Sequence, residues 1–351
     1  NQPILQARLN EPEVALTMSF RSPSVSKSRS EDENMCPPST APVRIRPISI
    51  GFTPSFASMI PRSAEISSPC SNVVSLCIAT LPLSILAGIP SFETSYSSSL
   101  YSRQNVESIV SVAEALDYNT SFFHGAANGS MGLSGFANTL GYDEYYGRTE
   151  FDNDEEFDGF WGIWDEPFFQ YTKSILDKKK TPFLSTIFTI SSHEPYIIPK
   201  KYEGKFDKGN LPMHQCVGYT DYSIRKFFES CRNSTWFEDT IFIFTADHAN
   251  QTFYPFYEKM VNRFANPLMI YKLNSDLVGV DNQLASHMDI FPTVADLIDY
   301  PRPFRSWGRS LISDKKNGII LTSYMDALFG IPTTAHILGG ACISKSENEG
   351  V

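Results

Sequence analysis

The stretch DTIFIFTADH (residues 239–248) decides the fold, because an apolar run leads directly into an acid and an imidazole. A continuous apolar run is typical of a strand that is buried on both faces of a parallel sheet. A carboxylate at the end of such a strand is costly to bury without compensation. We therefore expect Asp247 either to share a divalent cation with His248 or to cap the segment that follows it. The residues alone leave both alternatives open.

From about residue 84 onward, strand-like and helix-like segments alternate along the chain. Strands are expected at residues 118–123, 182–190, 239–245 and 266–273, and helices at residues 105–117, 165–180, 214–231 and 288–300. This alternation predicts an α/β fold with a mostly parallel central sheet and helices on both of its faces. The apolar run at 73–90 contains two prolines and several hydroxyl residues, which favour a buried strand and turn over a membrane helix.

Residues 1–83 differ in composition from the rest of the chain. They are rich in Ser, Pro and charged residues, and no hydrophobic period persists in them. Such a composition buries too little apolar surface to offset the entropy of ordering the chain. We therefore expect three parts: an irregular or disordered segment at 1–83, a folded domain at 84–331 and a tail at 332–351.

The charge of the chain bears on its partners. It contains 29 Lys and Arg against 39 Asp and Glu, which gives a formal net charge of −10. A nucleic acid is therefore not an expected partner, since the sequence offers no basic stripe to neutralise phosphates. The six cysteines show no zinc-finger or CxxC spacing and do not fix the redox compartment.

Four of the six histidines stand at predicted strand ends or just before a helix, namely His124, His193, His248 and His287. In a parallel sheet, ligands bind beyond the carboxyl ends of the strands. Each of these histidines alone has an ordinary alternative role, as a turn residue or a hydrogen-bonded core group. Their common placement nevertheless predicts a site at this edge, and an Asp–His pair suits Mn²⁺ or Zn²⁺.

A series of motifs occurs in order along the chain. They are SILAGIPSF (84–92), SFFHGAANGSMGLSGFANTLGYDEYYGRTEF (121–151), WGIWDEPFF (161–169), FTISSHEPY (188–196), GYTDYSIRKFF (218–228), FTADH (244–248), MDIFPTVADLI (288–298) and SWGRSL (306–311). In these motifs residues 84–330 resemble the lipoteichoic-acid-synthase-like, or phosphoglycerol-transferase-like, branch of the sulfatase and alkaline phosphatase superfamily. The resemblance implies an alkaline phosphatase/sulfatase-like fold and a catalytic domain at 84–331.

The resemblance also implies roles for individual residues. Asp247 and His248 match the pair that binds the catalytic metal, most often Mn²⁺, with Zn²⁺, Mg²⁺ or Ca²⁺ as alternatives. His193 matches a histidine near the substrate phosphate that donates a proton to the leaving or attacking oxygen. His124 matches a substrate-binding histidine of the same pocket. His287 stands near a histidine that binds a second metal in some members, and its alternative role is to start a helix.

Catalysis in the resembled family proceeds through a Thr or Ser nucleophile, whose hydroxyl pKa the metal lowers, and through a covalent phospho-enzyme. Neither that nucleophile nor the first metal-binding acid is recognisable here, and Thr80 is the candidate nucleophile because it is the only nearby hydroxyl of the right type. Met131 and Leu133 stand where lipoteichoic acid synthases have the Trp and Arg that grip glycerol phosphate. One hypothesis for the missing pattern is that residues 1–83 are an out-of-frame translation.

The expected function follows from the resemblance. It is metal-dependent transfer or hydrolysis of phosphate or sulfate esters, with phosphoglycerol or another phospholipid headgroup passed to an envelope glycan or lipid. The domain is expected outside the cytoplasm at the cell membrane, held there by membrane segments that this chain does not contain. The alternative is a catalytically inactive, truncated or frame-damaged relative with a partial metal site. An ordinary sulfatase is less favoured, because the Cys/Ser-x-Pro-x-Arg motif is missing.

Overall fold

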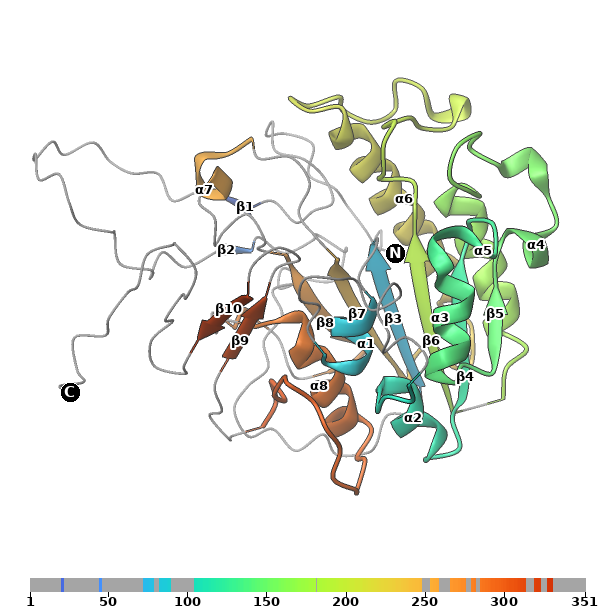
Figure 1. Ribbon diagram of the computed structural model, residues 1–351. Helices are drawn as coiled ribbons and strands as arrows, with labels where there is room; N and C mark the ends of the chain where they lie inside the picture. Colours follow the sequence, from blue (N-terminus) through green and yellow to red (C-terminus); the bar gives the residue numbers. More distant parts are fainter. Residues whose placement is uncertain are drawn as a thin grey trace, which may run out of the picture.

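The computed structural model describes residues 20–21, 44–45, 72–78, 82–89, 104–180, 182–247, 253–258, 266–275, 279–281, 285–313, 319–322 and 327–330. Within these residues a six-stranded sheet is flanked by helices (Figure 1). The predicted α/β class with a mostly parallel sheet is thereby confirmed.

The order of strands in this sheet is β5-β4-β6-β3-β7-β8. The strands are β3 (Asn72–Ile78), β4 (Asn119–His124), β5 (Glu144–Tyr146), β6 (Phe183–Thr189), β7 (Thr240–Ala246) and β8 (Leu268–Lys272). The first five run parallel to one another, whereas β8 is antiparallel to β7. Parallel strands end at a common edge, so the residues that follow β4, β6 and β7 meet at one end of the sheet.

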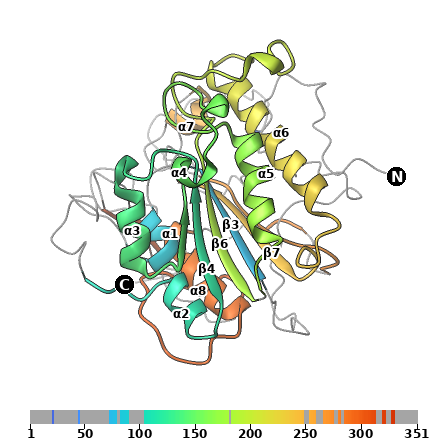
Figure 2. The same ribbon diagram turned by 90° about the vertical axis from the view of Figure 1, so that its right-hand side faces the viewer.

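Helices cover both faces of the sheet (Figure 2). One face carries α1 (Pro82–Ala87), α2 (Ile109–Glu114), α3 (Leu133–Leu140) and α8 (Ile290–Leu297), and the other carries α5 (Asp165–Leu176) and α6 (Met213–Cys231). Neighbouring strand residues divide between the two cores: Phe122 packs with the first group and Phe123 with the second. This division explains why the strands are apolar on both faces.

The shorter elements complete the described chain. They are η3 (Ser130–Gly132), α4 (Arg148–Phe151), η4 (Asp154–Glu156), η5 (Lys200–Tyr202), α7 (Pro255–Glu258), η7 (His287–Asp289), and the strand pairs β1 (Phe20–Arg21) with β2 (Arg44–Ile45) and β9 (Ile319–Thr322) with β10 (Ala327–Gly330). In the part of the chain that the structure describes, no helix is both long and apolar enough to span a membrane.

Strand β3 lies in the middle of the sheet, hydrogen-bonded to β6 on one side and β7 on the other. The apolar run at 73–90 thus forms β3 and the short helix α1, where the sequence predicts a strand and turn. Strand β3 also belongs to the segment 1–83, so these seven residues are regular. Most of that segment, and all of the tail 332–351, lie outside the described residues. The domain boundaries and the out-of-frame hypothesis therefore stay predictions.

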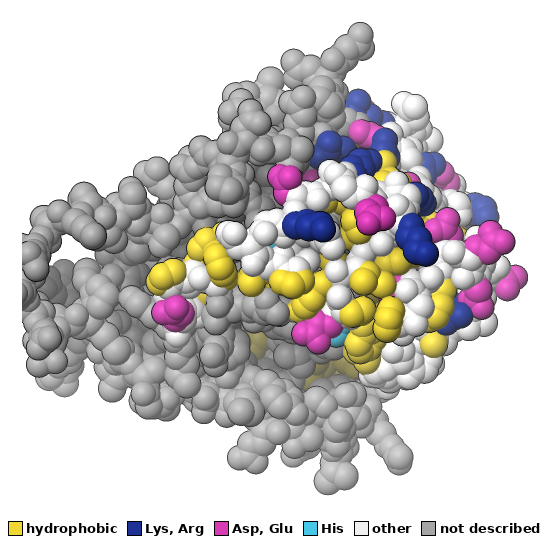
Figure 3. All heavy atoms as spheres, turned by 90° about the horizontal axis from the view of Figure 1, so that it is seen from above, with side chains coloured by type: hydrophobic (Ala, Val, Ile, Leu, Met, Phe, Trp, Pro, Cys, Tyr) yellow, Lys and Arg dark blue, Asp and Glu magenta, His cyan; other side chains and the backbone are white. Residues whose placement is uncertain are grey.

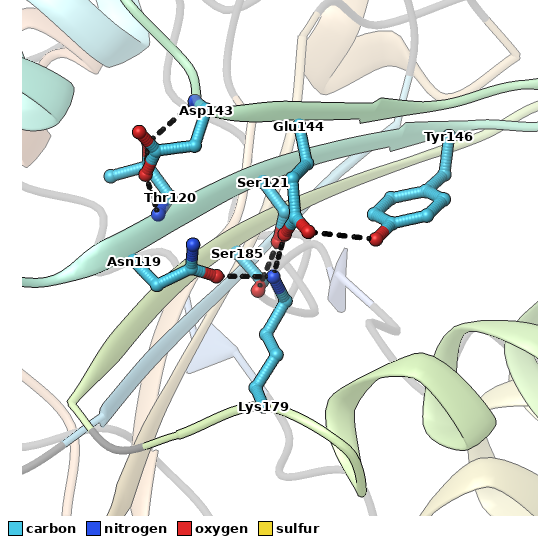
Figure 4. A network of polar contacts seen from close by, with 8 residues as sticks. All are labelled: Asn119, Thr120, Ser121, Asp143, Glu144, Tyr146, Lys179 and Ser185. Carbon is cyan, nitrogen blue, oxygen red and sulfur yellow. Dashed lines mark hydrogen bonds and ion pairs between the residues drawn. The ribbon is translucent and has the colours of Figure 1, made fainter.

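Polar contacts fix β4 to its neighbours (Figure 4). The Lys179 ammonium contacts the side chains of Asn119 and Glu144, which belong to β4 and β5. The Ser121 and Ser185 hydroxyls share a hydrogen bond of 2.7 Å between β4 and β6. Asn119 begins β4 and His124 ends it, so the Lys179 contacts anchor the end of the strand opposite to the imidazole.

Candidate active site

His124 ends strand β4 with its side chain fully buried. Its Nδ1 lies 3.1 Å from the carbonyl oxygen of Phe188 on β6, and the two rings meet edge to face. Burial lowers the pKa of His124 from 6.5 to about 4, although the bond to Phe188 opposes the shift. The ring is therefore neutral at neutral pH, and Nδ1 carries the proton that it donates to the carbonyl. Its Nε2 has no hydrogen-bond partner among the described residues, so its lone pair is available to a ligand.

His193 lies in the turn that follows β6 and is partly exposed. Its Nδ1 lies 3.2 Å from the carbonyl oxygen of Glu194, and its ring packs edge to face on Trp161 with 4.4 Å between the ring centroids. The indole N–H of Trp161 donates to the same Glu194 carbonyl. The imidazole is thus held from the side of Nδ1, which leaves Nε2 as the atom suited to proton transfer.

The buried carboxylate of Asp165 is hydrogen-bonded to the start of the turn that contains His193. Asp165, the first residue of α5, accepts hydrogen bonds from the backbone N–H groups of Ile190 (3.1 Å) and Ser191 (3.2 Å) and from the Thr220 hydroxyl (2.7 Å). Its own N–H donates to the Ser191 hydroxyl at 3.0 Å. Burial raises the pKa of Asp165, and the hydrogen bonds that it accepts oppose that rise.

Sequence reasoning missed the contribution of Asp165. An acid at a helix start is a common complement to the helix dipole, and this ordinary explanation concealed the tertiary role. The signal that could have found it is burial: Asp165 opens a helix directly after an aromatic loop, where a solvated acid is not expected.

Asp247 and His287 lie at the end of β7. Asp247 follows the last strand residue, and its side chain is buried at 5% exposure. His287, in η7, places Nε2 2.7 Å from the carbonyl oxygen of Ala246, the residue next to Asp247. The structure therefore brings His287 to the strand end that carries Asp247. Two other predicted site residues, His248 and Thr80, lie outside the described residues.

The edge of the sheet thus carries two imidazoles from β4 and β6 and a carboxylate from β7. Figure 3 views the molecule from above, the side toward which the parallel strands point in Figure 1, and shows histidine among hydrophobic and acidic side chains. The described residues contain no group of three or more His, Cys, Asp or Glu side chains that could hold a metal ion. The assignment of catalytic, substrate-binding and metal-binding roles stays a prediction.

Sheets of this class bind their ligands at the carboxyl edge, where these side chains lie. Comparison with known families is consistent with that class: the Sulfatase family model matches residues 71–300, more than half of the chain. The chain belongs to the sulfatase family. The match begins one residue before β3, upstream of residue 84 where the recognisable motifs begin.

Curated relatives include lipoteichoic acid synthases. The enzyme of Staphylococcus saprophyticus is 22% identical over 244 residues, which cover 63% of this chain and 38% of that protein. Lipoteichoic acid synthase 2 of Bacillus subtilis is 22% identical over 152 residues, which cover 42% of this chain and 23% of that protein. The chain therefore spans well under half of the length of these relatives.

Two solved structures show the same fold. A protein in the alkaline phosphatase superfamily from Vibrio parahaemolyticus superposes with a TM-score of 0.63 at 21% identity, covering 76% of this chain and 75% of that one. The lipoteichoic acid synthase LtaP from Listeria monocytogenes superposes with a TM-score of 0.58 at 15% identity, covering 74% and 70%. The fold is that of the alkaline phosphatase superfamily, as expected.

Proposed function

We propose that this protein is a metal-dependent enzyme that transfers or hydrolyses phosphate esters, with a phospholipid headgroup as donor and an envelope glycan or lipid as acceptor. Its membership of the sulfatase family and the lipoteichoic acid synthases among its relatives support phosphate-ester transfer in general. The observation that carries the proposal is the placement of His124, His193 and Asp247 after parallel strands at one edge of the sheet.

Asp247, His248 and His287 would hold the metal ion, with Mn²⁺ as the proposed ion. The donor chemistry fits, because a carboxylate and imidazoles suit Mn²⁺ and Zn²⁺, and because the buried Asp247 carboxylate gains a compensating charge. Such an ion, when bound, supplies positive charge that polarises phosphoryl oxygens and lowers the pKa of a hydroxyl.

The remaining catalytic roles belong to side chains of the protein. His193 Nε2 donates a proton to the leaving oxygen or accepts one from the attacking hydroxyl. His124 Nε2 accepts a hydrogen bond from a hydroxyl of the substrate, because its low pKa keeps the ring neutral at neutral pH. Thr80, outside the described residues, remains the proposed nucleophile.

The donor headgroup need not be glycerol phosphate. Met131 is 42% exposed and Leu133 is buried at 4% exposure, and neither can donate a hydrogen bond to a phosphate or a glycerol hydroxyl. A location outside the cytoplasm at the cell membrane is part of the proposal. It rests on the relatives that synthesise lipoteichoic acid.

The test is an assay of the full chain on p-nitrophenyl phosphate, its phosphodiester and its sulfate, with Mn²⁺ and after chelation. We expect turnover of a phosphate ester that chelation abolishes and that Asp247→Asn lowers at least about 100-fold. Equal background in the wild type and in Asp247→Asn would instead favour the second candidate, a catalytically inactive relative.

A further inference from the structure

The segment DGFWGIWD (residues 158–165), here called the connector, lies against the turn that directly follows His124 and against the turn that contains His193. On one side it meets the turn after β4: Gly162 forms an isolated bridge with Ala126. The N–H of Ile163 also donates to the Gly125 carbonyl at 2.9 Å. The connector is therefore bonded to the two residues that directly follow His124.

Gly162 lies close to residues of both turns. A Cβ at this position would lie 2.4 Å from the Gly125 carbonyl oxygen and 2.6 Å from Cδ1 of Ile190. Gly125 belongs to the turn after β4, and Ile190 begins the turn after β6. Only glycine fits this space without displacing one turn or the other.

The connector holds the turn after β6 at two points. Asp165 accepts hydrogen bonds from the N–H groups of Ile190 and Ser191, which open the turn. Trp161 donates to the Glu194 carbonyl, which directly follows His193, and packs on the His193 ring. The imidazole is thus fixed both before and after its own position in the chain.

The connector is itself rigidly built. The Asp158 carboxylate oxygen Oδ1 accepts from three successive N–H groups, those of Phe160 (2.8 Å), Trp161 (2.8 Å) and Gly162 (3.0 Å). The Asp158 N–H donates to the Gly162 carbonyl at 2.8 Å. A segment with these internal hydrogen bonds can hold the turns after β4 and β6 at a fixed separation.

We propose that the connector sets the position of His193 relative to His124, with Asp165 and Gly162 as its positioning residues. These residues do not touch the reacting atoms but act through the two imidazoles. The effect on turnover rests on the proposed function, whereas the effect on the geometry of the imidazoles does not. Misplacing a group by about 1 Å can cost about 100-fold in rate, so small shifts here are measurable.

The experiment uses the full chain labelled with ¹⁵N-histidine, in which His124→Gln and His193→Gln assign the two ring signals by NMR. Gly162→Ala is expected to move both signals, and Asp165→Ala to move that of His193. Gly135→Ala is the matched control for the first variant, because a Cβ at Gly135 meets nothing within 4 Å. Asp177→Ala is the control for the second, since Asp177 follows the other end of α5 and accepts from Ser234 and Trp236 there.

Activity on the p-nitrophenyl esters is measured in parallel. We expect kcat to fall about 10- to 100-fold in Gly162→Ala and Asp165→Ala with little change in KM, and both controls to keep wild-type kcat. If the variants shift the ring signals but the wild type shows no activity, the proposed function is refuted and the inference is supported. Ring signals that stay unmoved in the folded variants would overturn the inference, even if kcat fell.

Removing Asp165 could unfold the domain, so a gentler variant is included. Thr220→Val removes one of the three hydrogen bonds that the carboxylate accepts and keeps the side-chain volume. A thermal melt verifies that this variant is folded. A shifted His193 signal in folded Thr220→Val supports the inference, and an unchanged signal counts against it.

Discussion

The Nε2 atom of His287 lies 2.7 Å from the carbonyl oxygen of Ala246, which ties the start of the α8 region to the end of β7. A carbonyl oxygen only accepts, so Nε2 carries the proton and Nδ1 carries the lone pair of the neutral ring. In metal sites generally, a second contact of this kind at one ring nitrogen orients the other nitrogen toward the ion.

The first prediction concerns this histidine. If His287 is a ligand or orients one, His287→Ala should weaken Mn²⁺ binding about 10- to 100-fold in calorimetry on the full chain. His214→Ala is a suitable control, because its Nδ1 accepts from the N–H groups of Asn210 and Leu211 in the loop before α6. Equal affinities in wild type and His287→Ala would assign His287 to the helix start alone.

The second prediction concerns the pH dependence of stability. The pKa of His124 is lowered from 6.5 in the unfolded chain to about 4 in the folded protein, so between these values the unfolded state binds the extra proton. Stability from this group is therefore complete above pH 6.5 and is lost as pH falls to about 4. The loss amounts to about 3 kcal/mol.

Urea unfolding of the wild type and of His124→Gln across this range checks the sign. The free-energy difference between the two proteins should shrink as the pH falls, because only the wild type loses the contribution of the buried neutral imidazole. A difference that stayed constant with pH would show that His124 titrates normally in the folded state.

The third prediction concerns the core beneath α6. Phe228 is fully buried, and its ring contacts those of Phe242 on β7 and Tyr271 on β8. Phe228→Ala should lower the free energy of unfolding by about 3–5 kcal/mol, measured by urea denaturation. Phe160, which is 64% exposed, offers the same substitution at the surface, where we expect less than about 0.5 kcal/mol.

The fourth prediction concerns the amino end of β4. Lys179→Met keeps the apolar stem but removes the ammonium that contacts Asn119 and Glu144. The Glu144 carboxylate is partly exposed and can be solvated after the substitution. The free energy of unfolding should therefore fall by about 1 kcal/mol, less than when an unpaired charge is left buried. Lys178→Met changes the exposed neighbour and should leave the melting temperature unchanged. A loss of equal size in both variants would contradict the role of the buried contact.

Much of this fold could be predicted from the sequence, because continuous apolar strands and amphipathic helices each leave a local signature. The predicted helix at 214–231 is α6 (Met213–Cys231), and the predicted strand at 239–245 is β7 (Thr240–Ala246). The reversed direction of β8 could not be predicted in this way, since an apolar run does not record the direction of its neighbour.

The candidate site was predictable only in part, for a similar reason. The placement of His124 and Asp247 at strand ends could be predicted from the residue ranges of the expected strands alone. Asp165 does not, because the groups that bind its carboxylate lie 25, 26 and 55 residues away in the chain. Contacts of that range depend on how helix α5 meets strand β6, which no local pattern encodes.

The central position of β3 has a consequence for how this domain can be shortened. Its residues Asn72–Ile78 satisfy backbone groups of both β6 and β7. A shorter version that begins after residue 78 would lack β3 and leave five strands in two groups that are no longer hydrogen-bonded to each other, β5-β4-β6 and β7-β8. Each group would expose a new strand edge to other molecules. Any recombinant version meant to stay soluble must therefore keep the chain from at least Asn72 onward.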